Sequence, residues 1–564
     1  MRRRLHRFAL AAGLAAAPLA LPATAAEVTA DRLVRAAAEP GNWLMASRTY
    51  DGRRYSPLTI LDRANVGRLA LRFSVPLGGI GGSGNYTVAR QASPLVDGGH
   101  IYVADGWGRV SKIDGSNESG RIEWTMDPGQ DNLEAWFQPS HGLALIGNQV
   151  ISLASEGRLS WIDANTGELT RTVTVVDPRD GAYLATPPLV ADGKVIVGSG
   201  GGERGARASL SALDATTGEP RWRLYSIPAP GEAGAESWRD NANAWRNGGG
   251  SFEQVGAYDP ATNLTVWGTG RAAPRFERAL RPGDNLFAAS ALAIDAATGR
   301  LRWYFQFTPA DGIGFSAAGS YQLLPLAGGL AVGHFGRNGF HYLIDAANGA
   351  FRGAVAYAEG IDWTAGIDPA TGRPIEYIAA GREPPAYRLP EPDARRPGCP
   401  NLRALGGEPA AYSERTGLSY GMAADGCRMP VGPIGPGYLR HYADGNNVGG
   451  LFVGIDPAAG RHVANAWLDA PPHAGALATA GGLVFVPTAD GVLHVLDDRD
   501  LSEVSRHLFP TLTSAPPVTY AVGGKQYVAV ITGGNAWNDR LPAKPPGMFG
   551  VRPLFVLAVL GLPD

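Results

Sequence analysis

The sequence predicts an all-β protein, and three observations favour a β-propeller within that class. A pattern of the form apolar-Asp-x-x-(Thr)-Gly, in which the Thr is optional and the first copy has a longer turn, recurs along the chain, with copies starting at Ile113, Ile162, Leu213, Ile294, Ile344 and Ile455. Several of these starts are about 50 residues apart, which is typical of four-stranded propeller blades. Each copy follows a short run of alternating apolar residues, and helical periodicity is scarce outside residues 31–38.

The rival all-β interpretation is a series of two or three sandwich domains. Such a series requires Pro-rich or Ser-rich linkers between its modules, and only residues 383–400 have that composition. The prediction is therefore a single closed propeller over residues 27–564, with a long excursion around residues 383–430.

Three tryptophans end copies of the repeat at matching positions: Trp124, Trp222 and Trp303. We expect them to pack between blades instead of binding a ligand. The apolar run that begins at Leu554 is too short to span a membrane, so it is expected to be a closing strand.

Residues 1–26 have the features of an export signal. Arginines precede an apolar run from Phe8 to Leu21, and the small residues Ala23 to Ala25 follow it. A membrane anchor would need about 20 uninterrupted apolar residues, and Pro18 interrupts this shorter run. We expect a cleaved signal peptide, a periplasmic mature protein and no membrane span.

The composition narrows the classes of partner. Of the 564 residues, 45% are hydrophobic, which is enough for a sizeable core, and the formal net charge is -2 with both signs interspersed. This pattern excludes a nucleic-acid partner and favours a small ligand. An even number of cysteines in an exported chain, here Cys399 and Cys427, favours a disulfide over a metal site. No CxxCH motif is present, so no covalently attached haem is expected.

The stretch from Val197 to Arg207, VGSGGGERGAR, is the strongest candidate for a ligand site. Its glycines, which include Gly200, Gly201 and Gly202, permit positive φ and a close approach of the backbone to a ligand. One carboxylate, Glu203, follows them. The alternative interpretation is a flexible loop in a chain that contains 77 glycines.

Several motifs, in this order along the chain, resemble the quinoprotein alcohol dehydrogenases of the methanol and ethanol dehydrogenase type. They include GNWLMASRTYDGRRYSPLTILDRANVGRL, ARQASPLVDGGHIYVAD, GSGGGERGAR, YDPATNLTVWGTG, RPGDN, RNGFHYLIDAANG, TAGGLVFVPTADG and PVTYAVGGKQYVAVITGG. The resemblance implies an eight-bladed propeller that carries pyrroloquinoline quinone (PQQ) and a Ca²⁺ or lanthanide ion on its axis. It also implies oxidation of a primary alcohol and electron transfer to a separate periplasmic cytochrome c.

The resemblance assigns roles to positions of this chain. Gly200, Gly201 and Gly202 match the backbone that approaches the quinone, Glu203 matches a metal-binding glutamate, and Arg337 matches the positive residue that faces the quinone oxygens.

Two further cofactor-binding positions depart from the family. Gln91 stands at a glutamate position, and His141 stands at the position of an arginine that follows a cysteine pair absent from this chain.

Other departures concern the chemistry of the expected site. Arg271 stands at the position of a metal-binding asparagine, although a guanidinium has only donors. Gly314 stands at the catalytic aspartate, which leaves no general base there, and Asp311 is a weak substitute. Glu253 replaces the tryptophan on which the quinone stacks.

These departures leave two hypotheses for the function. The first is a divergent PQQ-dependent oxidoreductase whose metal and base have been reorganised. The second is a non-catalytic propeller that binds another small ligand or a protein partner. Because the site has lost several residues that would hold the quinone and the ion, a separate prediction is that PQQ and Ca²⁺ bind poorly or not at all. Arg271 is expected to pair with Glu203, and Glu253 to join Arg271 or Arg337.

Overall fold

The computed structural model describes most of the chain. The described residues are 27–78, 93–105, 108–129, 142–154, 156–239, 243–275, 277–358, 360–376, 408–424, 427–428, 439–440, 450–472, 474–513, 515–533 and 555–564. The side chains of Glu203 and of residues 424–449 lie outside this description. The predicted signal peptide, residues 1–26, also lies outside it.

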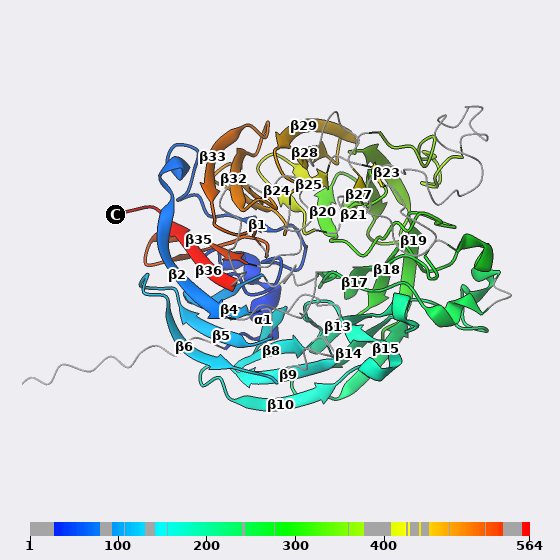
Figure 1. Cartoon of the computed structure of the whole chain (residues 1–564), viewed down its shortest axis with the longest axis horizontal. Coiled ribbons are helices and arrows are strands. Elements are labelled where there is room, and N and C mark those ends of the chain that lie inside the picture. Colours follow the sequence, from blue (N-terminus) through cyan, green and yellow to red (C-terminus); the bar gives the residue numbers. More distant parts are fainter. Residues whose placement is uncertain are drawn as a thin grey trace, which may run out of the picture.

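Eight antiparallel sheets of the described part are arranged as blades around one axis (Figure 1). The predicted eight-bladed propeller is therefore confirmed. Blade 1 contains β3 (Leu95–Asp97), β4 (His100–Ala104), β5 (Val110–Asp114) and β6 (Arg121–Met126). Blade 2 contains β7 (Leu143–Ile146), β8 (Gln149–Ala154), β9 (Arg158–Asp163) and β10 (Leu169–Thr174). Blade 3 contains β12 (Leu189–Ala191), β13 (Lys194–Gly200), β14 (Ser209–Asp214) and β15 (Pro220–Tyr225), with β11 (Tyr183–Leu184) paired to β13.

In the next three blades, as in the first three, the four strands lie in chain order from the axis outward (Figure 1). Blade 4 contains β16 (Ala257–Asp259), β17 (Leu264–Gly268), β18 (Ser290–Asp295) and β19 (Leu301–Gln306). Blade 5 contains β20 (Gln322–Leu326), β21 (Gly329–Phe335), β22 (Phe340–Asp345) and β23 (Phe351–Ala356). Blade 6 contains β24 (Ala411–Ser413), β25 (Leu418–Ala424), β28 (Gly450–Asp456) and β29 (Arg461–Leu468).

The last two blades use strands from the start of the described chain. Blade 7 contains β30 (Leu477–Thr479), β31 (Leu483–Pro487), β32 (Val492–Asp497) and β33 (Glu503–Leu508), with β1 (Tyr55–Ser56) parallel to β30. Blade 8 contains β34 (Val518–Val522), β35 (Lys525–Thr532), β36 (Phe555–Gly561) and β2 (Ala70–Gly78). The run predicted to close the fold is β36, and its pairing with β2 joins the two ends of the ring (Figure 1).

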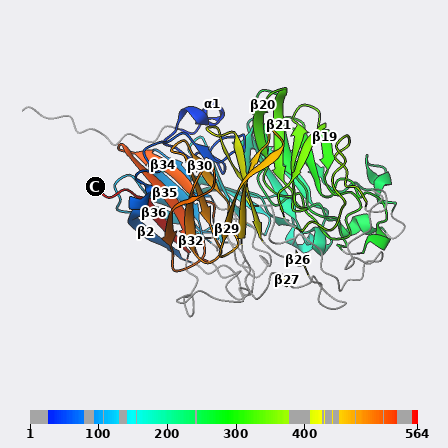
Figure 2. The same ribbon diagram turned by 90° about the horizontal axis from the view of Figure 1, so that it is seen from above.

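Short elements precede the blades, join neighbouring blades or lie in connections within a blade. They are α1 (Ala30–Val34), the two-stranded pair β26 (Cys427–Arg428) and β27 (Leu439–Arg440), and the 3-10 turns η1 (Ala36–Ala38), η2 (Val66–Arg68), η3 (Pro178–Asp180), η4 (Gly202–Arg204), η5 (Ala235–Trp238), η6 (Ala244–Asn247) and η7 (Arg278–Leu280). Figure 2 shows α1 on one side of the ring and the β26–β27 pair on the other. No helix among the described residues has the length and apolar character needed to cross a bilayer.

The repeat tryptophans join neighbouring blades, as predicted. The indole Nε1 of Trp124, Trp222 and Trp303 donates to a backbone carbonyl in the repeat turn of the next blade, at 3.1, 3.0 and 3.0 Å respectively. At Gly299 the φ is 72°, and a Cβ atom would lie 2.6 Å from the Trp222 ring. The turn glycine is therefore required both by its own backbone and by the neighbouring blade.

Arg54 fastens the N-terminal segment to the last two blades. It is buried, its Nε donates to the Ala476 carbonyl at 2.8 Å, and its Nη2 donates to the Pro517 carbonyl at 2.7 Å. Its Nη1 donates to the Ala46 carbonyl at 2.6 Å, and its guanidinium carbon lies 5.2 Å from the Trp43 ring centroid. Burial lowers the pKa of Arg54 to about 9.

Candidate functional site

Many of the predicted site residues lie at one end of the propeller. Neighbouring strands of a blade are antiparallel, so the segment that enters the first strand and the segment that joins the second and third strands share an end. Glu203, Arg271 and Arg337 follow second strands of blades 3, 4 and 5, whereas Glu253 and Gly314 precede first strands of blades 4 and 5. Three adjacent blades therefore supply these positions.

The glycine-rich bend after β13 is approached closely by the protein itself. A Cβ atom at Gly200 would lie 2.4 Å from the Tyr183 ring, and one at Gly202 would lie 2.4 Å from the Gly249 backbone. Gly201 has a φ of 104° and its Cβ position would lie 2.2 Å from the Gly181 carbonyl oxygen. The close approach that the sequence predicted for a ligand is made here by neighbouring backbone and by an aromatic ring.

Three arginines gather near this bend: Arg271, Arg275 and Arg337, which we call the arginine cluster. Burial lowers the pKa of Arg271 well below its usual value, and the positive charges of Arg275 and Arg337 lower it further. Each of the three residues nevertheless retains accessible surface. The cluster is therefore deep in the protein but not sealed from solvent.

Glu253 supplies a negative charge to the arginine cluster. Its Oε2 lies 3.7 Å from Arg337 Nη2, and the two side chains are 33% and 19% exposed. Arg337 is one of the two partners that the sequence suggested for Glu253. The pKa of Tyr183 rises to about 12 because of burial and then the Glu253 charge, so its hydroxyl is protonated at neutral pH.

Arg275 lies against the position expected for a catalytic carboxylate. Gly314 has a φ of 94°, and a Cβ atom there would lie 2.3 Å from Arg275 Nε. A side chain at position 314 therefore conflicts with both the local backbone and the Arg275 side chain.

Asp311, the weak candidate for a base, stabilises its own turn. Its Oδ1 accepts hydrogen bonds from the backbone N–H groups of Ile313 and Gly314, both at 2.8 Å. Burial raises the pKa of this carboxyl. Its Oδ2 is buried and has no hydrogen-bond partner among the described residues.

Arg281 holds the backbone that carries Arg275 and Asp311. Its Nη2 donates to the Arg275 carbonyl at 2.6 Å and to the Asp311 carbonyl at 2.8 Å, and its Nε donates to the Pro274 carbonyl at 2.9 Å. Arg281 is fully buried. No sequence pattern pointed to a role for Arg275, Arg281 or Tyr183, although Arg281 opens the RPGDN motif that contributed to the family resemblance.

Some predicted positions are outside the described residues. These are Gln91, His141 and Cys399. The backbones of Glu203 and Cys427 are described, in η4 and β26, but their side chains are not. The Glu203–Arg271 pairing and the Cys399–Cys427 disulfide therefore stay predictions.

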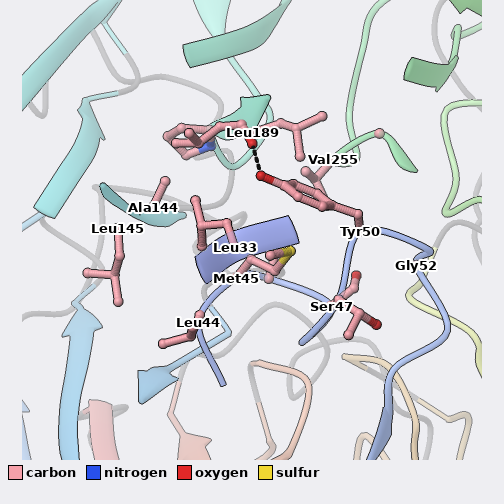
Figure 3. Close-up of a pocket in the computed structure, with 15 residues that line it drawn as sticks. Leu33, Leu44, Met45, Ser47, Tyr50, Gly52, Ala144, Leu145, Leu189 and Val255 are labelled. Carbon is pink, nitrogen blue, oxygen red and sulfur yellow. Dashed lines mark hydrogen bonds between the residues drawn. The ribbon is translucent and has the colours of Figure 1, made fainter. Parts of the chain in front are cut away.

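A second feature, an apolar pocket, contains none of these residues. Leu33, Met45, Tyr50 and Leu145 are among the side chains that line it, and the Tyr50 hydroxyl donates to the Val190 carbonyl at 2.6 Å (Figure 3). The pocket lies beside α1, β7 and β12. Its walls offer no cluster of titratable groups, so the arginine cluster remains the stronger candidate site.

Comparison with known proteins identifies the family. A profile described as "PQQ: Glucose/ethanol/alcohol dehydrogenase, beta-propeller domain" matches residues 43–350. The dehydrogenase subunit of the quinone alcohol dehydrogenase of Gluconacetobacter polyoxogenes is 32% identical, over 96% of this chain and 78% of that protein. The chain belongs to the quinoprotein alcohol dehydrogenase family. The resemblance found in the sequence is thereby confirmed.

Other members of the quinoprotein alcohol dehydrogenase family agree in sequence and in fold. Quinohemoprotein alcohol dehydrogenase ADH IIB of Pseudomonas putida is 31% identical over 97% of this chain and 81% of that protein. The structure of quinohemoprotein alcohol dehydrogenase ADHIIG from Pseudomonas putida HK5 matches with a TM-score of 0.82 and 29% identity, covering 95% of this chain and 82% of that chain. A europium-containing methanol dehydrogenase matches with a TM-score of 0.80 and 26% identity, covering 94% and 100%. Members of this family use PQQ and a metal ion.

Proposed function

We propose that this chain is a ligand-binding member of the quinoprotein alcohol dehydrogenase family that does not oxidise alcohols by the family's metal-assisted route. The observation that carries this proposal is the position of Arg275. Its side chain fills the space into which a residue at 314 would project, where the family places its catalytic aspartate. A general base cannot act from a position that an arginine occupies.

The residues of the arginine cluster do not fit a divalent cation. Guanidinium groups only donate hydrogen bonds, so Arg271 cannot replace an asparagine as a metal ligand. The charges of Arg275 and Arg337 act on the same space and repel a cation. Among the described side chains, no group of three His, Cys, Asp or Glu residues is placed to hold a metal ion.

The surroundings of Glu253 also disfavour PQQ, which accepts a hydride from the alcohol in the family's reaction. An aromatic ring beneath the quinone contributes about 0.5 to 1.5 kcal/mol beyond area burial. Glu253, at the position of that ring, offers a charge in its place and pairs with Arg337. We therefore propose that PQQ is held weakly.

A second function, that of a divergent alcohol oxidoreductase, is favoured by one observation. Asp311 is 6% exposed, its Oδ2 has no hydrogen-bond partner among the described residues, and burial raises its pKa. A buried carboxyl with a raised pKa is a recognised form of general acid or base. This function would require a bound quinone and a separate periplasmic cytochrome c as electron acceptor.

Export is part of both proposals. The arginines, the apolar run and the small residues of positions 1–26 support a cleaved signal peptide and a periplasmic mature protein. The mature N-terminus of the protein recovered from periplasm, read by mass spectrometry, tests this. An intact residue 1–26 segment would contradict it.

Reconstitution distinguishes the two functions. The purified protein is mixed with PQQ and Ca²⁺, the quinone absorption band is recorded, and dye-linked oxidation of ethanol is measured. The first proposal predicts no ethanol oxidation. Oxidation that the Asp311→Asn variant loses would establish the second function and refute the first.

A further inference from the structure

We propose that the apolar pocket beside α1 binds a small, uncharged, apolar molecule about as large as a single aromatic ring. The inference goes beyond the proposed function, since this pocket shares no residue with the arginine cluster. Two parts of the chain form most of its walls: α1 and residues 44–52 on one side, and the axial strands β7 and β12 of blades 2 and 3 on the other (Figure 3). A ligand in the pocket would contact both parts at once.

Backbone hydrogen bonds hold these walls in place. Val28, just before α1, exchanges two of them with Gly147 of blade 2, at 2.9 and 2.8 Å. Trp43 exchanges two with Val96 of blade 1, both at 2.8 Å, and so anchors the start of residues 44–52. The walls therefore cannot close on the hollow without breaking these bonds. A hollow that cannot collapse leaves apolar side chains without neighbours, which a bound apolar molecule would supply.

Tyr50 gives the pocket a fixed aromatic wall. Its hydroxyl donates to the Val190 carbonyl at 2.6 Å (Figure 3), and its backbone carbonyl accepts the Tyr258 N–H at 2.9 Å. Its ring lies edge-on to the Tyr258 ring, with 4.9 Å between the centroids. Burial raises the pKa of Tyr50, so its hydroxyl is uncharged at neutral pH. A rigid, neutral ring is a favourable packing surface for a ring-shaped apolar ligand.

The polar groups of the pocket do not favour a charged ligand. Among the lining residues, only Ser47, Thr49 and Tyr50 have polar side chains, and none of the lining side chains is charged at neutral pH. The Thr49 hydroxyl donates to Asp51 Oδ1 at 2.8 Å, so its proton is already engaged, like that of Tyr50. A charged ligand would lose its hydration here without gaining a partner of opposite charge. The pocket therefore selects apolar molecules over ions.

The dimensions of the pocket limit the size of the ligand. The hollow measures about 410 Å³, a value that includes space open to solvent. Drug-sized ligands occupy hollows of roughly 300–1,000 Å³, so the enclosed part of this one suits a smaller molecule. Leu33 and Leu44 are buried, whereas Met45 and Ser47 keep partial exposure and offer a route of entry. The flexible thioether side chain of Met45 can also adapt to the shape of the ligand.

Binding of toluene to the full-length mature protein tests this inference. Benzylammonium is the matched control, since it has the same ring and benzylic carbon but carries a positive charge. By isothermal titration calorimetry we expect saturable binding of toluene, with a Kd on the order of 1 mM or tighter, and none of benzylammonium. The melting temperature should also rise with toluene concentration. Equal binding of both compounds, or no toluene binding up to its limit of solubility, would overturn the inference.

Variants locate the binding in the apolar pocket. Ala144 on β7 lines the pocket and is 5% exposed, so Ala144→Leu places a larger apolar side chain in the hollow. We expect this variant to weaken toluene binding about tenfold or more, because the two occupy the same space. Ala297→Leu is the matched control, since Ala297 lies exposed in the turn between β18 and β19, outside the pocket.

A second variant covers the case in which Ala144→Leu does not fold, as judged by circular dichroism. Val255, another lining residue, is then replaced by leucine, and toluene binding to Val255→Leu should fall in the same way. Unchanged toluene binding in the folded pocket variant would contradict the inference. An equal loss of binding in Ala297→Leu would also contradict it, because the binding would then not depend on the pocket.

Discussion

The Arg275 side chain occupies the space into which any side chain at position 314 would project, since a Cβ atom at Gly314 would lie 2.3 Å from Arg275 Nε. The φ of 94° at Gly314 also suits glycine and strains other residues. Placing an aspartate at position 314 therefore requires a change at Arg275 as well.

The variant Gly314→Asp should lower the free energy of unfolding by about 1 to 3 kcal/mol through steric conflict and backbone strain. Adding Arg275→Ala should recover part of this loss, because the steric conflict is removed. Gly312→Ala is the matched control, since a Cβ atom there would come no closer than 3.6 Å to a neighbouring atom. Urea denaturation measures the free energy of unfolding of the three variants, which should be lowest for Gly314→Asp alone. Equal stability of Gly314→Asp and Gly312→Ala would disprove the steric argument.

Replacement of Arg54 should destabilise the whole propeller. Arg54→Met leaves the carbonyls of Ala46, Ala476 and Pro517 without this buried donor. We expect the free energy of unfolding to fall by about 3 kcal/mol or more, as it does when other buried charged networks are broken. The exposed Arg68 on η2 gives the control variant Arg68→Met. Thermal unfolding that is identical in the two variants would show that Arg54 does not fasten the segment.

Two buried histidines should make stability fall in mild acid. Burial lowers the pKa of His334 to about 4 and that of His341 to about 3, from 6.5. The unfolded chain therefore binds more protons than the folded protein below pH 6.5. Stability from these groups is complete above that pH and is lost as the pH falls toward 4, by about 1.4 kcal/mol per pH unit for each histidine.

The His341→Phe variant isolates one of these groups. Its Nε2 is buried without a hydrogen-bond partner among the described residues, so an aromatic replacement sacrifices no hydrogen bond of that atom. Denaturant unfolding between pH 4 and pH 7 should give a shallower pH dependence for the variant than for the wild type. Parallel curves would show that folding does not lower the pKa of His341.

A disulfide between Cys399 and Cys427 remains a prediction from the sequence. It would close a loop of about 29 residues and contribute roughly 3 to 4 kcal/mol by the chain-entropy argument. Mass spectrometry of the unreduced periplasmic protein should find the two cysteines linked. Two free thiols would reject the prediction.

The fold was predictable from the sequence because its signals are local. The Asp-x-x-Thr-Gly turns, such as the one at Asp295, fix their own hydrogen bonds within a few residues. The tryptophans that follow three of the repeat turns then dock on the next blade, as Trp222 does at Ala296. Spacing and turn chemistry together therefore indicate a propeller, and the family resemblance supplies the number of blades.

The site was predictable only in part because its contacts join distant connections. Position-by-position comparison with the family drew attention to Arg271, Gly314 and Glu253. It could not place the Arg275 side chain over Gly314, since that depends on the bonds from Arg281 to the Arg275 and Asp311 carbonyls. Nor could it show that the Tyr183 ring packs on Gly200.

The metal content of the native protein tests the central claim most directly. The protein is purified from periplasm, dialysed against metal-free buffer and analysed for calcium and lanthanides by elemental mass spectrometry. Because Arg271 stands at the position where the sequence comparison predicts a metal-binding asparagine, we predict no stoichiometric metal. One calcium or lanthanide ion per chain, retained through dialysis, would contradict the account.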